Sequence, residues 1–183
     1  MTGAGQSRED PCVQTGIKGS SHCNRVISCA ITEVSPDLSK QNPYNLVKYS
    51  FKISTWNVLS LESSSSKLYE LARVTSEYET DVMTLTETHR PGTGVVVLEN
   101  GNLFINSGKM DGIRRQGVGV VLSKRVKNSL ISYTPVSERV MWLRLHSKQV
   151  NVSVVVAYAP TEDAEDSEKD GFYHEVTGVL DGT

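Results

Sequence analysis

The chain has 183 residues, of which 38% are hydrophobic and 22% are charged, and its formal net charge is −2. This length and composition suit one globular domain with a sizeable core and a tail. The slightly acidic balance excludes a strongly basic nucleic-acid-binding module.

Residues 1–48 are rich in Ser, Gly, Gln, Asn and Pro and predict a disordered leader, in which only 25–34 has the composition of a strand. Three cysteines, Cys12, Cys23 and Cys29, lie in this region. Their odd number, with no signal peptide after Met1, argues against a disulfide scaffold and for a reducing, intracellular compartment. No apolar run is long enough for a transmembrane helix, so no membrane partner is expected.

Structure is expected to begin near Tyr49, and the predicted domain covers 49–183. Hydrophobic and polar residues alternate over 51–58, which predicts a strand. Apolar residues recur at helical spacing over 67–79, and a short run rich in β-branched residues follows at 81–87. This strand–helix–strand order permits a parallel crossover.

Strand patterns dominate the rest of the chain until a last amphipathic helix at 168–181. The predicted strands are 94–98, 102–106, 117–123, 129–133, 139–145 and 150–159. Basic residues gather between Lys109 and Lys127, where they could bind phosphates or simply form a solvated loop and strand edge. Many strands with two helices predict a layered α/β domain built on packed sheets.

Three polar residues stand at predicted strand ends: Asn57 after "ISTW", Glu87 after "VMTLT" and Tyr158 after "VVVA". A carboxylate beside an amide suits Mg²⁺, which takes oxygen ligands and commonly only one or two carboxylates. A tyrosine hydroxyl can donate to a phosphoryl oxygen. Each residue also has a plain structural explanation: Asn57 as a turn residue, Glu87 as a solvated strand end, and Tyr158 as part of the core.

Taken in order, "STWNV", "LTET", "GVGVVLS" and "AYAPT" resemble the endonuclease/exonuclease/phosphatase superfamily. Within it, the chain is most similar to the endonuclease domains of LINE-type retrotransposons and to the craniofacial development protein 2-like proteins. The resemblance covers about 51–181 and implies a DNase I-like fold. That fold is a four-layer α/β/β/α sandwich with the site at one end.

The resemblance also implies roles for the three residues. Asn57 would order the site and reach the scissile phosphate, Glu87 would bind the catalytic Mg²⁺ together with Asn57, and Tyr158 would contact the phosphate. The implied reaction is hydrolysis of a phosphodiester in DNA, which would place the protein in the nucleus.

Two departures from the superfamily pattern limit this expectation. Leu59 stands where nuclease members often carry an acidic residue, and the chain has neither a Gly-Asp-x-Asn motif nor an Asp-His pair. The sequence therefore predicts a truncated sandwich, the N-terminal part of the domain, with weak Mg²⁺ binding and incomplete catalysis. Two alternatives stay open: a non-catalytic retroelement-derived binding module, whose uncovered sheet would bind a protein partner, and a phosphatase of the same superfamily.

Overall fold

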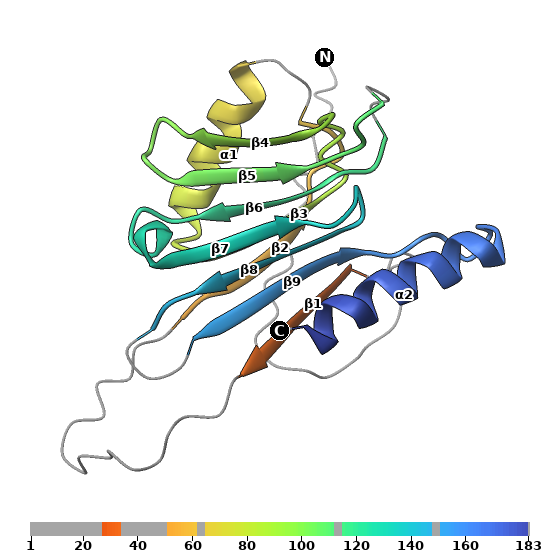
Figure 1. The fold of residues 1–183 in the computed structure, drawn as a ribbon. Coiled ribbons are helices and arrows are strands. Elements are labelled where there is room, and N and C mark those ends of the chain that lie inside the picture. The colour runs from red at the N-terminus through yellow and green to blue at the C-terminus, as the bar shows by residue number, and fades with distance from the viewer. Residues whose placement is uncertain (1–26, 34–50, 62–64, 112–114, 148–150, 183) are drawn as a thin grey trace, which may run out of the picture.

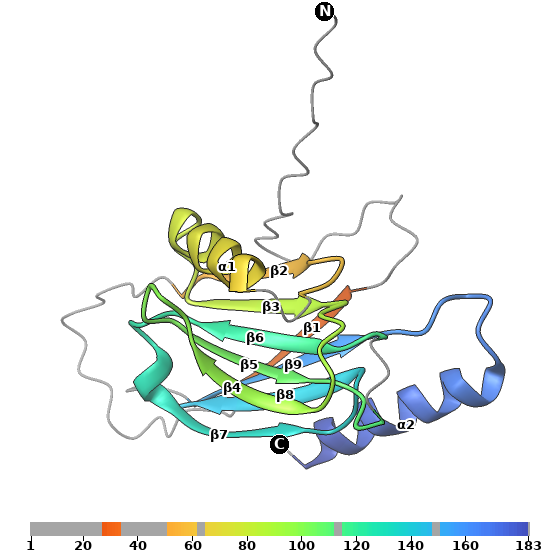
Figure 2. The ribbon, with the colours of Figure 1, turned by 90° about the horizontal axis from the view of Figure 1, so that it is seen from above.

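The structure, a computed structural model, describes residues 27–33, 51–61, 65–111, 115–147 and 151–182, with the side chains of 27–33 and Ser65 left undescribed. Two β-sheets pack face to face, and each carries one helix on its outer face, as Figure 1 and Figure 2 show. The predicted α/β fold of packed sheets flanked by helices is confirmed. None of the described helices is long and apolar enough to cross a membrane.

The described part of the chain contains nine strands, two α-helices and one 3₁₀ turn at Lys127–Ser129. In chain order they are β1 (Ile27–Glu33), β2 (Ile53–Asn57), α1 (Ser65–Glu77), β3 (Val82–Thr86), β4 (Thr93–Val97), β5 (Leu103–Ser107), β6 (Val118–Leu122), β7 (Leu130–Pro135), β8 (Val140–Leu145), β9 (Val152–Tyr158) and α2 (Asp166–Asp181). Every element predicted after residue 50 is present, with ends that differ by at most two residues.

The five-stranded sheet has the order β2-β3-β6-β5-β4. Strands β2 and β3 are parallel, with Asn57 beside Thr86, and α1 makes the crossover between them as predicted. The other pairs in this sheet are antiparallel. Consequently the carboxyl ends of β2 and β3 meet at one edge, together with the start of β6 and the end of β5.

The four-stranded sheet has the order β1-β9-β8-β7, and all its pairs are antiparallel. Residues 27–33, within the one segment of the predicted leader that had the composition of a strand, form its edge strand β1, with Ile27 beside Tyr158 and Glu33 beside Val152. Pairing with β9, more than a hundred residues away in sequence, supplies the hydrogen bonds that a local reading of the segment could not foresee. The rest of the predicted leader lies outside the described residues.

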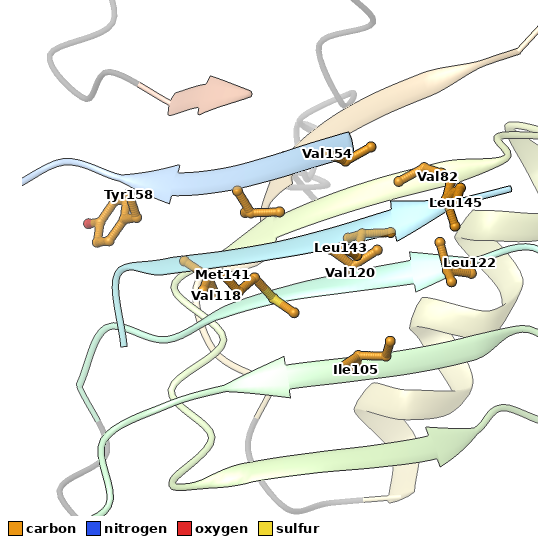
Figure 3. Close-up of a cluster of buried hydrophobic side chains, with 11 residues drawn as sticks. Val82, Ile105, Val118, Val120, Leu122, Met141, Leu143, Leu145, Val154 and Tyr158 are labelled. Carbon is orange, nitrogen blue, oxygen red and sulfur yellow. The ribbon is translucent and has the colours of Figure 1, made fainter. Parts of the chain in front are cut away.

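Three apolar clusters hold the four layers together. The largest lies between the sheets and includes Val82, Val120, Met141, Leu143 and Val154, all buried (Figure 3). A second joins α1 to the outer face of the five-stranded sheet, and a third joins α2 to the outer face of the four-stranded sheet. Because side chains alternate along a strand, β9 serves both the inter-sheet and the α2 cluster.

Three basic residues of the segment 109–127 lie at two different ends of the sandwich. Arg125 is ion-paired with the buried Asp81 just before β3, and Lys127 Nζ donates to the Gly101 carbonyl at 2.8 Å. The hydrogen bond and then the charge of Asp81 raise the pKa of Arg125. These two basic residues therefore support the end of the fold opposite to Glu87, while Lys109 follows β5 at the same end as Glu87.

Candidate active site

The structure brings Asn57, Glu87 and Tyr158 to the same end of the sandwich. Asn57 ends β2, Glu87 follows β3 directly, and Tyr158 ends β9 in the other sheet. Strand alternation puts Asn57 on the same face as Ile53, which packs into the inter-sheet cluster, and Tyr158 belongs to that cluster as well. The three residues thus lie at one end of the two sheets, where Tyr158 contacts Glu87 and where Figure 3 shows Tyr158 at the end of the row of core residues.

A short hydrogen bond joins two of these residues across the sandwich. Tyr158 Oη donates to Glu87 Oε1 at 2.6 Å, and both residues are 7% exposed. This distance is typical of a hydroxyl bound to a carboxylate, which is stronger than a bond between neutral groups. The bond fixes the carboxylate at the mouth and leaves the phenol oxygen beside it, so both could face one ligand.

Asn57 is held by a local turn and not by Glu87. Its Oδ1 accepts from the backbone N–H of Leu59 at 3.2 Å, which is an Asx turn. Leu59 itself is 61% exposed and has a φ of 50°. The turn orients the amide of Asn57, while Leu59 presents its apolar side chain to solvent.

The loops around Glu87 have an unusual backbone. Five of the six non-glycine residues with positive φ in the described chain lie in these loops. They are Leu59, Ser60, Glu87, His89 and Gln116. Such residues each cost on the order of 1 kcal/mol and persist only where the surroundings impose them, often at functional sites.

Backbone hydrogen bonds supply that support. Ser60 N donates to the Glu87 carbonyl at 2.8 Å, and Thr88 N donates to the Gly117 carbonyl at 3.1 Å, so the loops after β2 and β3 and before β6 are joined. Gly117 N in turn donates to the carbonyl of Glu138, in the loop between β7 and β8, at 3.1 Å. The mouth is therefore a framework of backbone bonds that spans both sheets.

Buried hydroxyls without a partner surround this framework. Thr55 Oγ1, Ser60 Oγ, Thr86 Oγ1 and Thr88 Oγ1 are buried and make no hydrogen bond with the described residues. Thr86 is 0% exposed and lies beside Asn57 on the inter-sheet face. A buried hydroxyl that lacks a partner costs free energy, so these oxygens are potential contacts for water or a ligand.

The donor set fits Mg²⁺ only in part. Glu87 and Asn57 supply the hard oxygen atoms that this ion prefers. Within the described ranges, however, no three His, Cys, Asp or Glu side chains lie close enough together to hold a metal ion. Any ion bound here would keep several waters or take ligands from a substrate phosphate.

Arg139 is a neighbour of the site that the sequence did not single out. Its guanidinium carbon lies 5.5 Å from the centroid of the Tyr158 ring, and its side chain is 13% exposed. It also lines a polar cavity of about 370 Å³ between the loop 135–139 and α2, beside the site. Asn57, Glu87 and Tyr158 do not line this cavity. In the sequence, the only sign of this role was a basic residue directly before β8, which is too common a feature to identify a site residue.

The chain has clear similarity to two curated proteins. It is 30% identical over 151 residues to craniofacial development protein 2 of Bos taurus and 28% identical over 145 residues to the protein of the same name from Tragulus javanicus. The alignments cover 82% and 79% of this chain, which spans about a quarter of the length of these relatives. No known family profile matches the chain. The predicted resemblance to the craniofacial development protein 2-like proteins is thus supported by homology to craniofacial development protein 2 itself.

Proposed function

We propose that this chain carries the metal-binding and phosphate-contacting part of a Mg²⁺-dependent, endonuclease-like phosphodiester hydrolase of the endonuclease/exonuclease/phosphatase superfamily. The proposal rests above all on the bond from Tyr158 to Glu87 at the sandwich mouth, beside Asn57. Homology to craniofacial development protein 2 and the order of the sequence motifs also support it. The corresponding partner would be DNA, and the corresponding compartment the nucleus.

Each residue has a distinct role in this proposal. Glu87, with help from the Asn57 amide, would hold Mg²⁺, which would supply Lewis-acid polarisation of a phosphoryl oxygen. Asn57 orients the scissile phosphate, because the Asx turn fixes its amide at the strand end. Tyr158 has one hydroxyl hydrogen, which it donates to Glu87 in this structure and would turn toward a phosphate oxygen as negative charge develops there. These roles cover binding and orientation of the phosphate, and activation of the attacking water would fall to other groups.

The test is a titration of the chain with Mg²⁺ and Mn²⁺, followed by calorimetry or water-proton relaxation. A single carboxylate should give binding no tighter than the millimolar range, or about 4 kcal/mol. Glu87→Gln should abolish it, and Glu99→Gln, which changes an exposed glutamate between β4 and β5, should not. Equal binding by all three proteins would contradict the proposal.

Nicking of supercoiled DNA supplies a second measurement. Because the 183 residues contain no Gly-Asp-x-Asn motif and no Asp-His pair, we expect a polypeptide of these residues to show no Mg²⁺-dependent nicking above background. Nicking that is lost in Glu87→Ala would show that other residues complete the site and that the prediction of incomplete catalysis is wrong.

A second candidate function is a non-catalytic binding module, and the donor set favours it. Of the three candidate residues only Glu87 carries a carboxylate, and the described residues hold no cluster of three metal-binding side chains. In this case DNA or a protein partner would bind equally well with and without Mg²⁺. A DNA-binding measurement in EDTA and in Mg²⁺ separates the two candidates, since the hydrolase site requires that Mg²⁺ strengthen phosphate binding.

A further inference from the structure

Arg139 contacts Tyr158 through both its backbone and its side chain. Its carbonyl accepts from Tyr158 N at 2.8 Å, and its Nη1 donates to the Tyr158 carbonyl at 3.2 Å. The same guanidinium stands 5.5 Å from the centroid of the Tyr158 ring. At this distance a cation is attracted to the face of the ring. One side chain therefore restrains the backbone and the ring of Tyr158 together.

Helix α2 holds Arg139 from the other side. Arg139 Nη2 donates to Glu168 Oε1 at 2.6 Å. About two turns further along the same face of α2, Glu175 Oε2 accepts from Ser137 Oγ at 2.6 Å. Glu168 and Glu175 are seven residues apart and flank Phe172, which packs on the four-stranded sheet. The face of α2 that covers the sheet thus also binds the loop that carries Arg139, through these two hydrogen bonds.

We propose that Arg139 is a positioning residue, which transmits the position of α2 to the candidate site through the sequence of contacts Glu168–Arg139–Tyr158–Glu87. Its effect on metal binding rests on the function proposed above, whereas its effect on Tyr158 does not. Glu168, at the first turn of α2, is the remote end of this chain of contacts.

The geometry explains why an arginine stands here. The planar guanidinium donates to Glu168 and to the Tyr158 carbonyl at once, and its central carbon still lies over the ring. A positive charge over the ring draws electron density from the phenol, which strengthens the hydroxyl as a donor to Glu87. A lysine would keep the charge but could not hold the two acceptors in one plane.

The position of Tyr158 can be followed directly by fluorine NMR on the chain labelled with 3-fluorotyrosine. The chain has 7 tyrosines, and the resonance that Tyr158→Phe removes is that of Tyr158. Arg139→Gln and Glu168→Gln should move or broaden this resonance and leave the others in place. Arg139→Lys should restore part of the change in Arg139→Gln. Asp170→Asn removes the same charge from the exposed side of α2 and should leave the Tyr158 resonance unchanged.

An unchanged Tyr158 resonance in Glu168→Gln would overturn the proposal, as would a change of equal size in Asp170→Asn. Glu168→Gln is decisive even if Arg139→Gln fails to fold, because Glu168 is 45% exposed and its replacement leaves the core intact.

Titration with Mn²⁺ extends the test to the site. Glu168→Gln and Arg139→Gln should weaken Mn²⁺ binding roughly fivefold, about 1 kcal/mol. A site that depends on Glu87 but binds equally well in both variants would overturn the positioning role. If the parent chain binds no Mn²⁺, the proposed function fails, and the fluorine resonance alone decides whether Arg139 positions Tyr158.

Discussion

Replacing Tyr158 with phenylalanine tests the bond on which the candidate site depends. Phenylalanine keeps the ring in the inter-sheet cluster and removes only the hydroxyl that donates to Glu87 at 2.6 Å. Hydrogen bonds to charged groups contribute about 1.5–3 kcal/mol, and a buried carboxylate that loses a donor bears the larger part of this cost. We therefore expect Tyr158→Phe to lower the free energy of unfolding by about 2 kcal/mol.

Urea unfolding measures this change well, because the chain carries one tryptophan in each sheet, Trp56 in β2 and Trp142 in β8. With a denaturant dependence of about 2 kcal/mol per molar urea, typical for a domain of this size, the midpoint should fall by about 1 M. Tyr133→Phe is the matched control, since Tyr133 lies on the edge strand β7 and is 39% exposed. Its midpoint should stay within about 0.25 M of the parent value.

A double-mutant cycle shows whether the loss belongs to this one bond. Glu87→Gln and Tyr158→Phe remove its two ends, so the double variant should lose less stability than the two single losses together, by at least about 1 kcal/mol. Strictly additive losses, or a midpoint for Tyr158→Phe equal to that of Tyr133→Phe, would refute the reasoning.

Two further predictions each compare a residue beside the site with a residue at the opposite end of the fold, and both use the same urea measurement. Gly117→Ala should lower the free energy of unfolding by at least about 2 kcal/mol, because Gly117 has a φ of 96° and a new Cβ would lie 2.4 Å from Thr88 Oγ1. Gly101→Ala, at a φ of 82° in open space, should lower it by only about 1 kcal/mol. Equal losses of stability in the two variants would contradict the role of the clash. Thr75→Val should lower the free energy of unfolding by about 1–3 kcal/mol, since the Thr75 hydroxyl bonds two carbonyls and two asparagine amides. Thr86→Val should leave this free energy unchanged or raise it, because Thr86 Oγ1 is buried without a partner among the described residues. A comparable loss in Thr86→Val would show that its hydroxyl has a ligand.

Most of the sandwich could be predicted because its strands obey local rules. Valines 152, 154 and 156 alternate with Ser153 and Val155, and this period of two fixes both the strand and the faces that it buries. The helix between β2 and β3 is long enough to permit a parallel crossover, and the pair is parallel. The composition of 25–34 indicated a strand, but the place of β1 beside β9 could not be predicted, because that pairing joins segments far apart in the sequence.

The residues of the candidate site also fall into those that the sequence could predict and those that it could not. Asn57 and Glu87 end two consecutive parallel strands, so topology alone places them at one edge. Tyr158 belongs to the other sheet, and only the resemblance of its motif to a known superfamily indicated that it would join them. Arg139 could not be found from the sequence, because a cation before a strand is common and its contacts with Tyr158 and Glu168 exist only in the folded chain.

Because the bond between Tyr158 and Glu87 spans the sandwich, the position of the candidate metal ligand depends on how the two sheets pack. Beneath the mouth, Val118 of one sheet and Met141 of the other belong to the same buried cluster as Tyr158 (Figure 3). A second hydrogen bond joins the two sheets at this end, where Ser107 Oγ of β5 donates at 2.7 Å to the carbonyl of Ser137, in the loop between β7 and β8. A shift of one sheet against the other would therefore move the phenol away from the carboxylate before any strand unfolded. Since interiors are close-packed and transmit such shifts, the geometry of this site depends on the packing of the whole sandwich as well as on the loops that carry its residues.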